Sequence, residues 1–368
     1  ADGTFLIVGA PLTIVTPTIN SGAVYVFQAL LGGVFTQTAT MNLGAVAGAE
    51  FGTAIATHPT SNVFAVGAPA VAHGKSSSAV GEVYVYTHNG LTWSKSADIA
   101  PASVSSASKS KFGSSLAMTG DLLVVGAPGY AGAGAVFVFE LAGGTWTERH
   151  LLTQATSGDL FGTAVAVDAS GAMLLVGAPG ASDKGSAAGA AVVFRYDGSD
   201  WLEDARLTAE GSDSGDLLGS SVALSDDGVT AVAGTNRASG AAGFVLVFED
   251  RAGALGDTWE GVAALYEPDA ASGEANAFGT AVALVGSTLL VGAPTATAFG
   301  VPSAGTAYVF EQSPGLSTSA SMVTLNTTYV ATSTPSVVFT PHTMVVGEAA
   351  HDLTGGMVLV YRRLSQAE

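Results

Sequence analysis

The side chains that could do chemistry in this chain are mostly carboxylates. Its 368 residues include 30 Asp and Glu against 12 Lys and Arg, which gives a formal net charge of −18 at pH 7. Sixteen of the 30 acidic residues fall between positions 197 and 274, where only Arg206, Arg237 and Arg251 oppose them. Such a stretch is either a face for cations and basic partners or a solvated, solubilising surface. Phosphate backbones would be repelled, so nucleic acid is a poor candidate partner.

Linear motifs of enzyme chemistry are absent from the sequence. It contains no Gly-x-Ser-x-Gly elbow, no His-Glu-x-x-His and no Walker loop. Cysteine is also absent, which excludes disulfides, thiol nucleophiles and Cys-ligated metals. We therefore expect no enzyme, no catalytic residue and no bound organic cofactor. The histidines are scattered at no ligand spacing, at His58, His73, His88, His150, His342 and His351.

A sequence repeat indicates which elements position these side chains. Val-Gly-Ala-Pro occurs at residues 8–11, 66–69, 125–128, 176–179 and 291–294. Degenerate copies occur at 232–235 and 346–349. The seven copies are spaced 51 to 59 residues apart. A fixed period of this size indicates a repeat architecture. The apolar residues come in short bursts, and none approaches the roughly 20 residues that span a bilayer, so we expect no membrane insertion.

Two further markers recur in register with this tetrapeptide. A Phe-Gly pair precedes it, with Leu218-Gly219 as a variant, and Gly-x-x-aromatic-Val-aromatic follows it. Consecutive apolar residues in the tetrapeptide segments predict strands covered on both faces, and Pro ends each strand. A more polar segment such as 145–152 predicts an outer strand. Each period is thus typical of a four-stranded antiparallel blade, and the chain of an all-β, seven-bladed β-propeller.

The Phe-Gly and Gly-Ala-Pro markers resemble those of the FG-GAP repeat family, the propeller also found in the head of integrin α subunits. The resemblance covers essentially the whole chain and is closest to short-loop microbial and protist members. We expect one propeller domain over 1–368, with blades of roughly 1–43, 44–99, 100–153, 154–209, 210–267, 268–325 and 326–368. The terminal blades are expected to be incomplete, so that the polypeptide continues past one end.

Calcium is the cofactor that this resemblance implies, because relatives carry an Asp-x-Asp/Asn-x-Asp-Gly loop between the first two strands of a blade. Alternating oxygen ligands and a turn-making Gly let such a loop surround the cation. No loop of this chain offers three alternating ligands. The remaining weak candidates are Asp226 and Asp227, then Asp168. The segment 213–216, Asp-Ser-Gly-Asp, is weaker still.

The family usually binds partners at one rim, which is formed by the loops between the second and third strands and by the connections between blades. These loops carry small residues and few charges, which favours a broad contact over a small-molecule pocket. The expected rim contacts are His73, Lys75, Tyr130, Asp183, Lys184 and Phe299. Asn326-Thr327-Thr328 is a sequon, which predicts glycosylation in a secretory lumen.

Two functions remain open at this point. The first is a non-enzymatic, extracellular or cell-surface module for adhesion or protein–protein contacts, with protein partners or neighbouring subunits of a surface assembly. Its alternative is a carbohydrate-binding propeller with glycan ligands. A hydrolase or lyase ranks third, because no cluster of titratable groups can be assembled from the sequence.

Overall fold

A computed structural model describes residues 5–362 of the chain. Outside the described residues lie 1–4, 17–18, 31–33, 45, 73–78, 103–108, 155, 211–212, 238–241, 252–257, 269–275, 298–304, 312–320, 327–335, 341–342, 353–354 and 363–368. Within the described part of the chain, no helix is long and apolar enough to cross a membrane.

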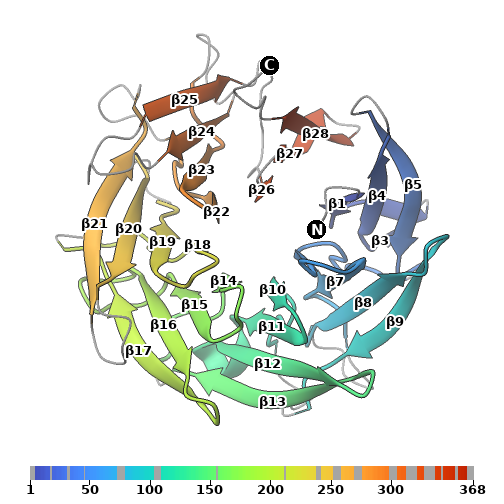
Figure 1. The fold of residues 1–368 in the computed structure, drawn as a ribbon, viewed down its shortest axis with the longest axis horizontal. Coiled ribbons are helices and arrows are strands. Elements are labelled where there is room, and N and C mark those ends of the chain that lie inside the picture. Colours follow the sequence, from blue (N-terminus) through green and yellow to red (C-terminus); the bar gives the residue numbers. More distant parts are fainter. Residues whose placement is uncertain are drawn as a thin grey trace. The chain divides into compact units, whose positions relative to one another are not determined.

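The described strands form sheets in which neighbours follow the order of the chain (Figure 1). The first sheet has three strands, β1 (Phe5–Ala10), β4 (Ala23–Ala29) and β5 (Phe35–Asn42). Two four-stranded sheets follow, β6 (Ile55–Thr57), β7 (Val63–Ala68), β8 (Glu82–His88) and β9 (Trp93–Ile99), then β10 (Ser115–Thr119), β11 (Leu122–Ala127), β12 (Ala135–Ala142) and β13 (Thr145–Thr153).

Three more four-stranded sheets complete the middle and second half of the chain. They are β14 (Val165–Val167), β15 (Met173–Ala178), β16 (Ala190–Tyr196) and β17 (Trp201–Leu207); β18 (Ser221–Leu224), β19 (Thr230–Gly234), β20 (Phe244–Asp250) and β21 (Trp259–Tyr266); and β22 (Ala281–Val285), β23 (Thr288–Ala293), β24 (Thr306–Glu311) and β25 (Ser321–Asn326). The last sheet has three strands, β26 (Ser336–Thr340), β27 (Thr343–Asp352) and β28 (Gly355–Arg362).

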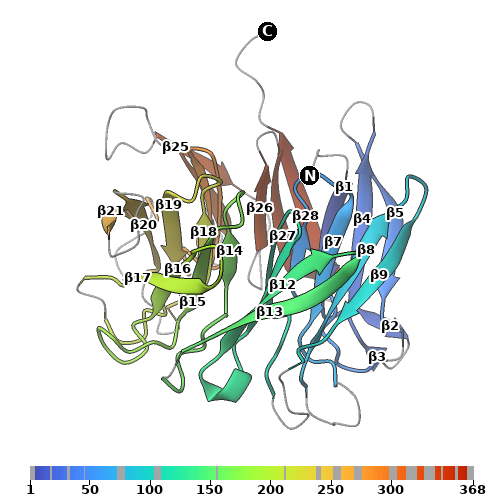
Figure 2. The ribbon, with the colours of Figure 1, turned by 60° about the horizontal axis from the view of Figure 1, so that its bottom comes forward.

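Two small elements interrupt the loops that follow second strands. A hairpin of β2 (Ile14–Thr16) and β3 (Ile19–Asn20) lies beyond one end of β4 and β5 (Figure 2), and a single 3₁₀ turn, η1, spans Tyr130–Gly132. The chain divides into two compact units, Ala1–Val167 with Tyr196–Trp201, and Asp168–Arg195 with Leu202–Glu368.

The predicted propeller with four-stranded antiparallel blades is therefore confirmed. The predicted number of seven blades is not: only five of the described sheets hold the four strands of a complete blade, and the first and last hold three. The extent of the single domain stays a prediction.

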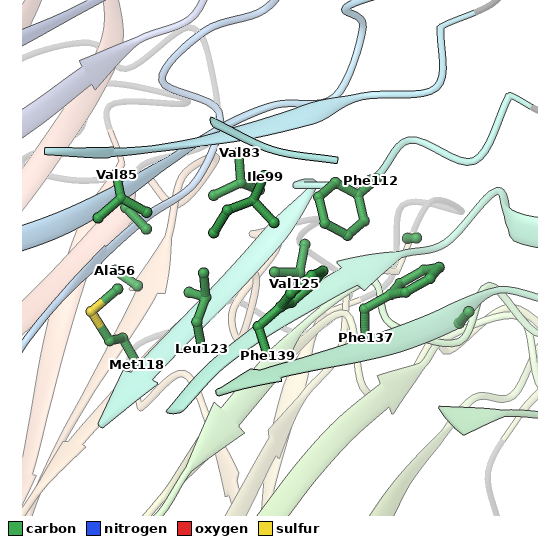
Figure 3. Close-up of a cluster of buried hydrophobic side chains, with 13 residues drawn as sticks. Ala56, Val83, Val85, Ile99, Phe112, Met118, Leu123, Val125, Phe137 and Phe139 are labelled. Atoms are coloured by element: carbon green, nitrogen blue, oxygen red, sulfur yellow. The ribbon is translucent and has the colours of Figure 1, made fainter. Parts of the chain in front are cut away.

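The core of the first unit lies between neighbouring sheets. Val83, Val85 and Ile99 of one sheet pack against Leu123 and Val125 of the next in a single buried cluster (Figure 3). The second strands are buried along nearly their whole length, as in β11 and β15. A strand with neighbours on both faces must be apolar on both, which is why these segments are uninterrupted apolar runs.

The Phe of each Phe-Gly pair fills the interior beside the aromatic residues of the third strand. Phe112 is fully buried, with ring centroids 5.2 Å from Phe137 and 5.9 Å from Phe139 (Figure 3). In the second unit Phe278 has the same relation to Tyr308 and Phe310, at 5.6 and 6.0 Å. The Phe of the Phe-Gly marker and the aromatic residues of the Gly-x-x-aromatic-Val-aromatic marker thus pack against each other.

The glycines of the markers let one blade's turn lie against the previous blade's strand. A Cβ at Gly67 would lie 1.9 Å from the carbonyl oxygen of Gly113, and one at Gly126 would lie 2.1 Å from that of Gly162. Gly177 meets Gly219 in the same way. Only a residue without a side chain fits at such a backbone contact.

Two recurrent features were not predicted from the sequence. The residue after each Phe-Gly or Leu-Gly donates its hydroxyl to the carbonyl three residues earlier, as in Thr53, Ser114, Thr163, Ser220 and Thr280. A β-bulge also shifts the register between the third and fourth strands at one position of the repeat, between Val26/Phe27, Val85/Tyr86, Val138/Phe139 and Val247/Phe248.

Candidate functional site

Asp168, one of the calcium candidates, is buried and forms a turn. Its carboxylate accepts hydrogen bonds from the Ser170 hydroxyl and from the backbone N–H groups of Ser170, Ala172 and Met173. A carboxylate with this many donors stabilises the connection between β14 and β15. This is the turn role that Asp takes for backbone reasons.

The other two calcium candidates lie in the turn between β18 and β19. Asp227 accepts hydrogen bonds from the Ser225 hydroxyl, at 2.6 Å, and from the Val229 backbone N–H. The Ser225 hydrogen bond is the main cause that lowers the pKa of Asp227 below its ordinary value. Asp226 is exposed. In the described part of the chain, no three His, Asp or Glu side chains gather as a metal site would require; calcium binding by this chain stays a prediction.

The structure describes only some of the expected rim residues, and these differ in their contacts. His73, Lys75 and Phe299 lie outside the described residues, and so does the side chain of Asn326, the last residue of β25. Tyr130 does not stand free on the rim, because its ring packs edge-on against Phe137 at 5.6 Å. Lys184 is exposed. Asp183 forms an ion pair with Arg206, at 2.8 Å.

The structure brings a different set of charged side chains together. Arg237, in the loop after β19, donates from Nε to Asp216 Oδ1 at 2.5 Å and from Nη2 to Asp213 Oδ2 at 3.3 Å. Its Nη1 donates to the backbone carbonyl of Ala242 at 3.3 Å. We call Asp213, Asp216 and Arg237 the rim site. Its two carboxylates come from the segment that the sequence suggested as the weakest calcium candidate.

The three side chains of the rim site differ sharply in exposure. The Asp216 carboxylate is 2% exposed, the Arg237 side chain 18% and the Asp213 side chain 83%. The guanidinium also lies over the ring of buried Phe244, with Cζ 5.6 Å from the ring centroid. Asp216 and Phe244 therefore hold Arg237 from within, while Asp213 meets solvent.

Arg237 keeps hydrogen-bonding capacity for a ligand. A guanidinium has five N–H donors, and three of them are used by Asp216, Asp213 and Ala242. Within the described residues the other two N–H groups have no acceptor. The site therefore offers a pre-oriented cation with two donors beside an exposed carboxylate, which can bind and polarise a carbonyl oxygen.

The loop after β15 lies next to the rim site. The Gly215 backbone N–H donates to the Ser186 carbonyl at 2.9 Å, and Leu217 donates likewise to Ala187 at 3.1 Å. This loop carries Asp183, which pairs with Arg206 of β17, and exposed Lys184. Two loops from different repeats thus meet at one place, which their separation in the sequence does not reveal.

One sequence signal could have pointed to this site. The sheet of β18 to β21 carries an altered copy of the tetrapeptide, in which Thr235 stands at the place of the usual Ala, directly after the Gly that contacts the next blade. The Thr235 hydroxyl donates to the Phe244 carbonyl and accepts from the Phe244 N–H, at 2.9 and 2.8 Å. Arg237 follows two residues later. The repeat is most altered where the charged side chains converge.

Two solved structures share the fold over nearly the whole chain. The structure is similar to a periplasmic gluconolactonase from Pseudomonas aeruginosa, with 16% identity, a TM-score of 0.63 and coverage of 98% of this chain and 92% of the other. It is also similar to a putative 6-phosphogluconolactonase from Bacteroides uniformis, with 11% identity, a TM-score of 0.62 and the same coverages. No curated protein matches the sequence.

These neighbours correct the expectation that the chain is a non-enzymatic adhesion module. Both are named as lactonases, so the fold found here also serves enzymes. The expectation rested on the absence of linear motifs, but a propeller assembles its sites from loops of different blades, so no linear motif is needed. The integrin-like role, the protein or glycan partners, glycosylation and the extracellular location stay predictions.

Membership of a family is shown by the sequence itself. Four stretches match the model of the FG-GAP repeat, residues 93–139, 146–194, 201–248 and 259–310. Each runs from the fourth strand of one blade to the third strand of the next, for example from Trp93 at the start of β9 to Phe139 in β12. Together they span just over half of the 368 residues, and the chain belongs to the FG-GAP repeat family.

Proposed function

We propose that this protein is a hydrolase that opens an uncharged lactone at the rim site. The observation that carries the proposal is Arg237, held by buried Asp216 with two N–H donors unused among the described residues, beside exposed Asp213. The neighbours named as lactonases support it, because they show what this fold serves elsewhere.

The chemistry assigns one role to each charged side chain. Arg237 donates hydrogen bonds to the carbonyl oxygen of the lactone and stabilises the negative charge that grows there. The Asp213 carboxylate accepts a proton from a water molecule as that water attacks the carbonyl carbon. The ring C–O bond then breaks, the ring oxygen takes that proton from Asp213, and the product is the open hydroxy acid. Asp216 positions Arg237 and does not touch the substrate.

The charge of the molecule favours an uncharged substrate. The formal net charge is −18, and more than half of the acidic residues lie between 197 and 274, the stretch that contains the rim site. A surface of this sign repels anions and slows their encounter. Phosphorylated lactones are therefore expected to have a lower kcat/KM than uncharged lactones. Added salt screens the repulsion and should reduce this difference in kcat/KM.

The test is acid release from an uncharged aldono-δ-lactone, measured above the spontaneous rate. We expect turnover by the wild type and a loss of about 10²-fold or more in kcat/KM for Asp213→Asn and for Arg237→Met. Because Asp213 is 83% exposed, Asp213→Asn should fold normally.

Matched controls come from exposed ion pairs on outer strands. Asp98→Asn removes the partner of Lys95, and Arg149→Met removes the partner of Glu140, and both should leave turnover unchanged. No acid release above the spontaneous rate, or wild-type turnover in Asp213→Asn, would overturn the proposal.

A further inference from the structure

A pair of aromatic rings extends the rim site toward the end of β21. The ring of Tyr266, the last residue of that strand, lies 6.0 Å from the ring of Phe244. Phe244 in turn lies beneath Arg237 and is buried. Tyr266 is 59% exposed, so one aromatic residue is covered and its neighbour is open to solvent.

Three other described sheets have no aromatic pair at this position. Phe244 and Tyr266 face each other in register, where the corresponding pairs are Ala23 with Asn42, Ala135 with Thr153, and Thr306 with Asn326. Those sheets fold with small or polar residues there. The fold therefore does not require an aromatic pair at this position.

The backbone that carries Tyr266 is anchored by its neighbour. Glu267 turns inward, is buried, and accepts hydrogen bonds from the Asn276 side-chain amide and the Tyr308 hydroxyl. Asn276 is fully buried and accepts from the backbone N–H groups of Gly243 and Phe278. The ring of Tyr266 is thus exposed on a fixed backbone, which is what a pre-organised binding surface needs.

We propose that Tyr266 is a specificity-determining residue on which the ring of a sugar lactone stacks. The inference rests on the proposed function and names its substrate class: lactones of sugars, in preference to aliphatic lactones of the same ring size. A sugar ring presents C–H groups on one face and hydroxyls at its edge. An exposed aromatic face suits the C–H groups, and the two Arg237 N–H groups without an acceptor among the described residues suit the oxygens.

The experiment measures binding, so that it does not depend on turnover. The probe is the sugar δ-lactam, which keeps the ring and the carbonyl but resists hydrolysis, and its Kd is measured by calorimetry. We expect Tyr266→Ala to raise the Kd about tenfold, which corresponds to about 1.4 kcal/mol. Tyr266→Phe keeps the ring and should change the Kd less than about twofold.

Tyr196→Ala, at a partly exposed Tyr of β16, is the control and should leave the Kd unchanged. Equal affinity of the wild type and Tyr266→Ala would overturn the inference, as would a wild type that does not bind the lactam. Binding that depends on Tyr266 without any lactone turnover would support the stacking role and overturn only the proposed function.

Discussion

At the scale of single residues, the repeated positions and the divergent positions do different work. Phe112 and Phe278 occupy the same place in two blades and fill the interior there. Arg237 and Tyr266 have no such counterparts; Arg237 belongs to the rim site, and Tyr266 is exposed near it. In a repeat protein, departures from the repeat are therefore the better guide to function.

Buried tyrosines predict how the stability of the protein depends on pH. Tyr86 is 7% exposed and stacks on Phe64, and burial, followed by the charge of Asp98, raises its pKa to about 12. Burial also raises the pKa of Tyr84. An unfolded chain releases the Tyr proton at pH ~10. The stabilisation by Tyr86 is thus complete below that pH and is lost as the pH rises through 12.

We expect the free energy of unfolding to fall by about 2–3 kcal/mol from Tyr86 across this window. Urea unfolding between pH ~9 and ~12 would measure it, and Tyr86→Phe should flatten the fall. Tyr266→Phe, at an exposed Tyr, is the matched control. A Tyr86→Phe profile parallel to that of the wild type would contradict the assignment.

At the scale of elements, the step from one blade to the next is a contact between backbones. Gly126 of β11 lies against the Gly162 carbonyl, and Ser115 of β10 donates its hydroxyl to that same carbonyl at 2.9 Å. In the second unit Ser221 donates likewise to the Gly279 carbonyl, which lies against Gly234. The tetrapeptide is a packing device, and its Gly is the part that cannot be exchanged.

Gly126→Ala should therefore destabilise the fold strongly. Its Cβ would lie 2.1 Å from both the Gly162 carbonyl oxygen and Ser115 Oγ, so the two blades would have to separate. We expect a loss of about 2–4 kcal/mol in the free energy of unfolding, measured by urea denaturation.

The control for this substitution is Gly261→Ala in β21, where the nearest atom to a new Cβ is a Phe248 ring carbon at 3.7 Å. That change should stay within about 1 kcal/mol. A Gly126→Ala protein as stable as Gly261→Ala would show that the contact is not tight.

At the scale of the whole molecule, charge opposes compactness. The 30 Asp and Glu outnumber the 12 Lys and Arg, and the resulting net charge of −18 repels itself in the folded state. Self-repulsion of this kind destabilises a compact chain while keeping it soluble.

Salt should consequently stabilise the protein. Raising NaCl from about 10 mM to about 100 mM shortens the Debye length from about 30 to about 10 Å, and we expect a rise of a few degrees in Tm. A variant with Glu50→Gln, Asp121→Asn and Asp226→Asn, three exposed positions, should show a smaller rise. A Tm that falls with salt in the wild type would contradict this view.

The sequence by itself determined the family, the strand order within a blade and the burial of the second strands. Those properties depend on neighbouring residues and on a period, and both are visible along the chain. The polar pattern of residues 145–152 also predicted an outer strand, and the structure has β13 there, at Thr145–Thr153.

Only the tertiary structure decided which charged residues meet. Asp213 and Asp216 were candidate calcium ligands in the sequence, but the fold places Arg237, more than 20 residues away, against both. Whether a carboxylate can bind a metal ion or pairs with an arginine depends on which loops lie side by side. That is fixed by the packing of the blades, because residues distant in the sequence are brought together only when the sheets that carry them are in place.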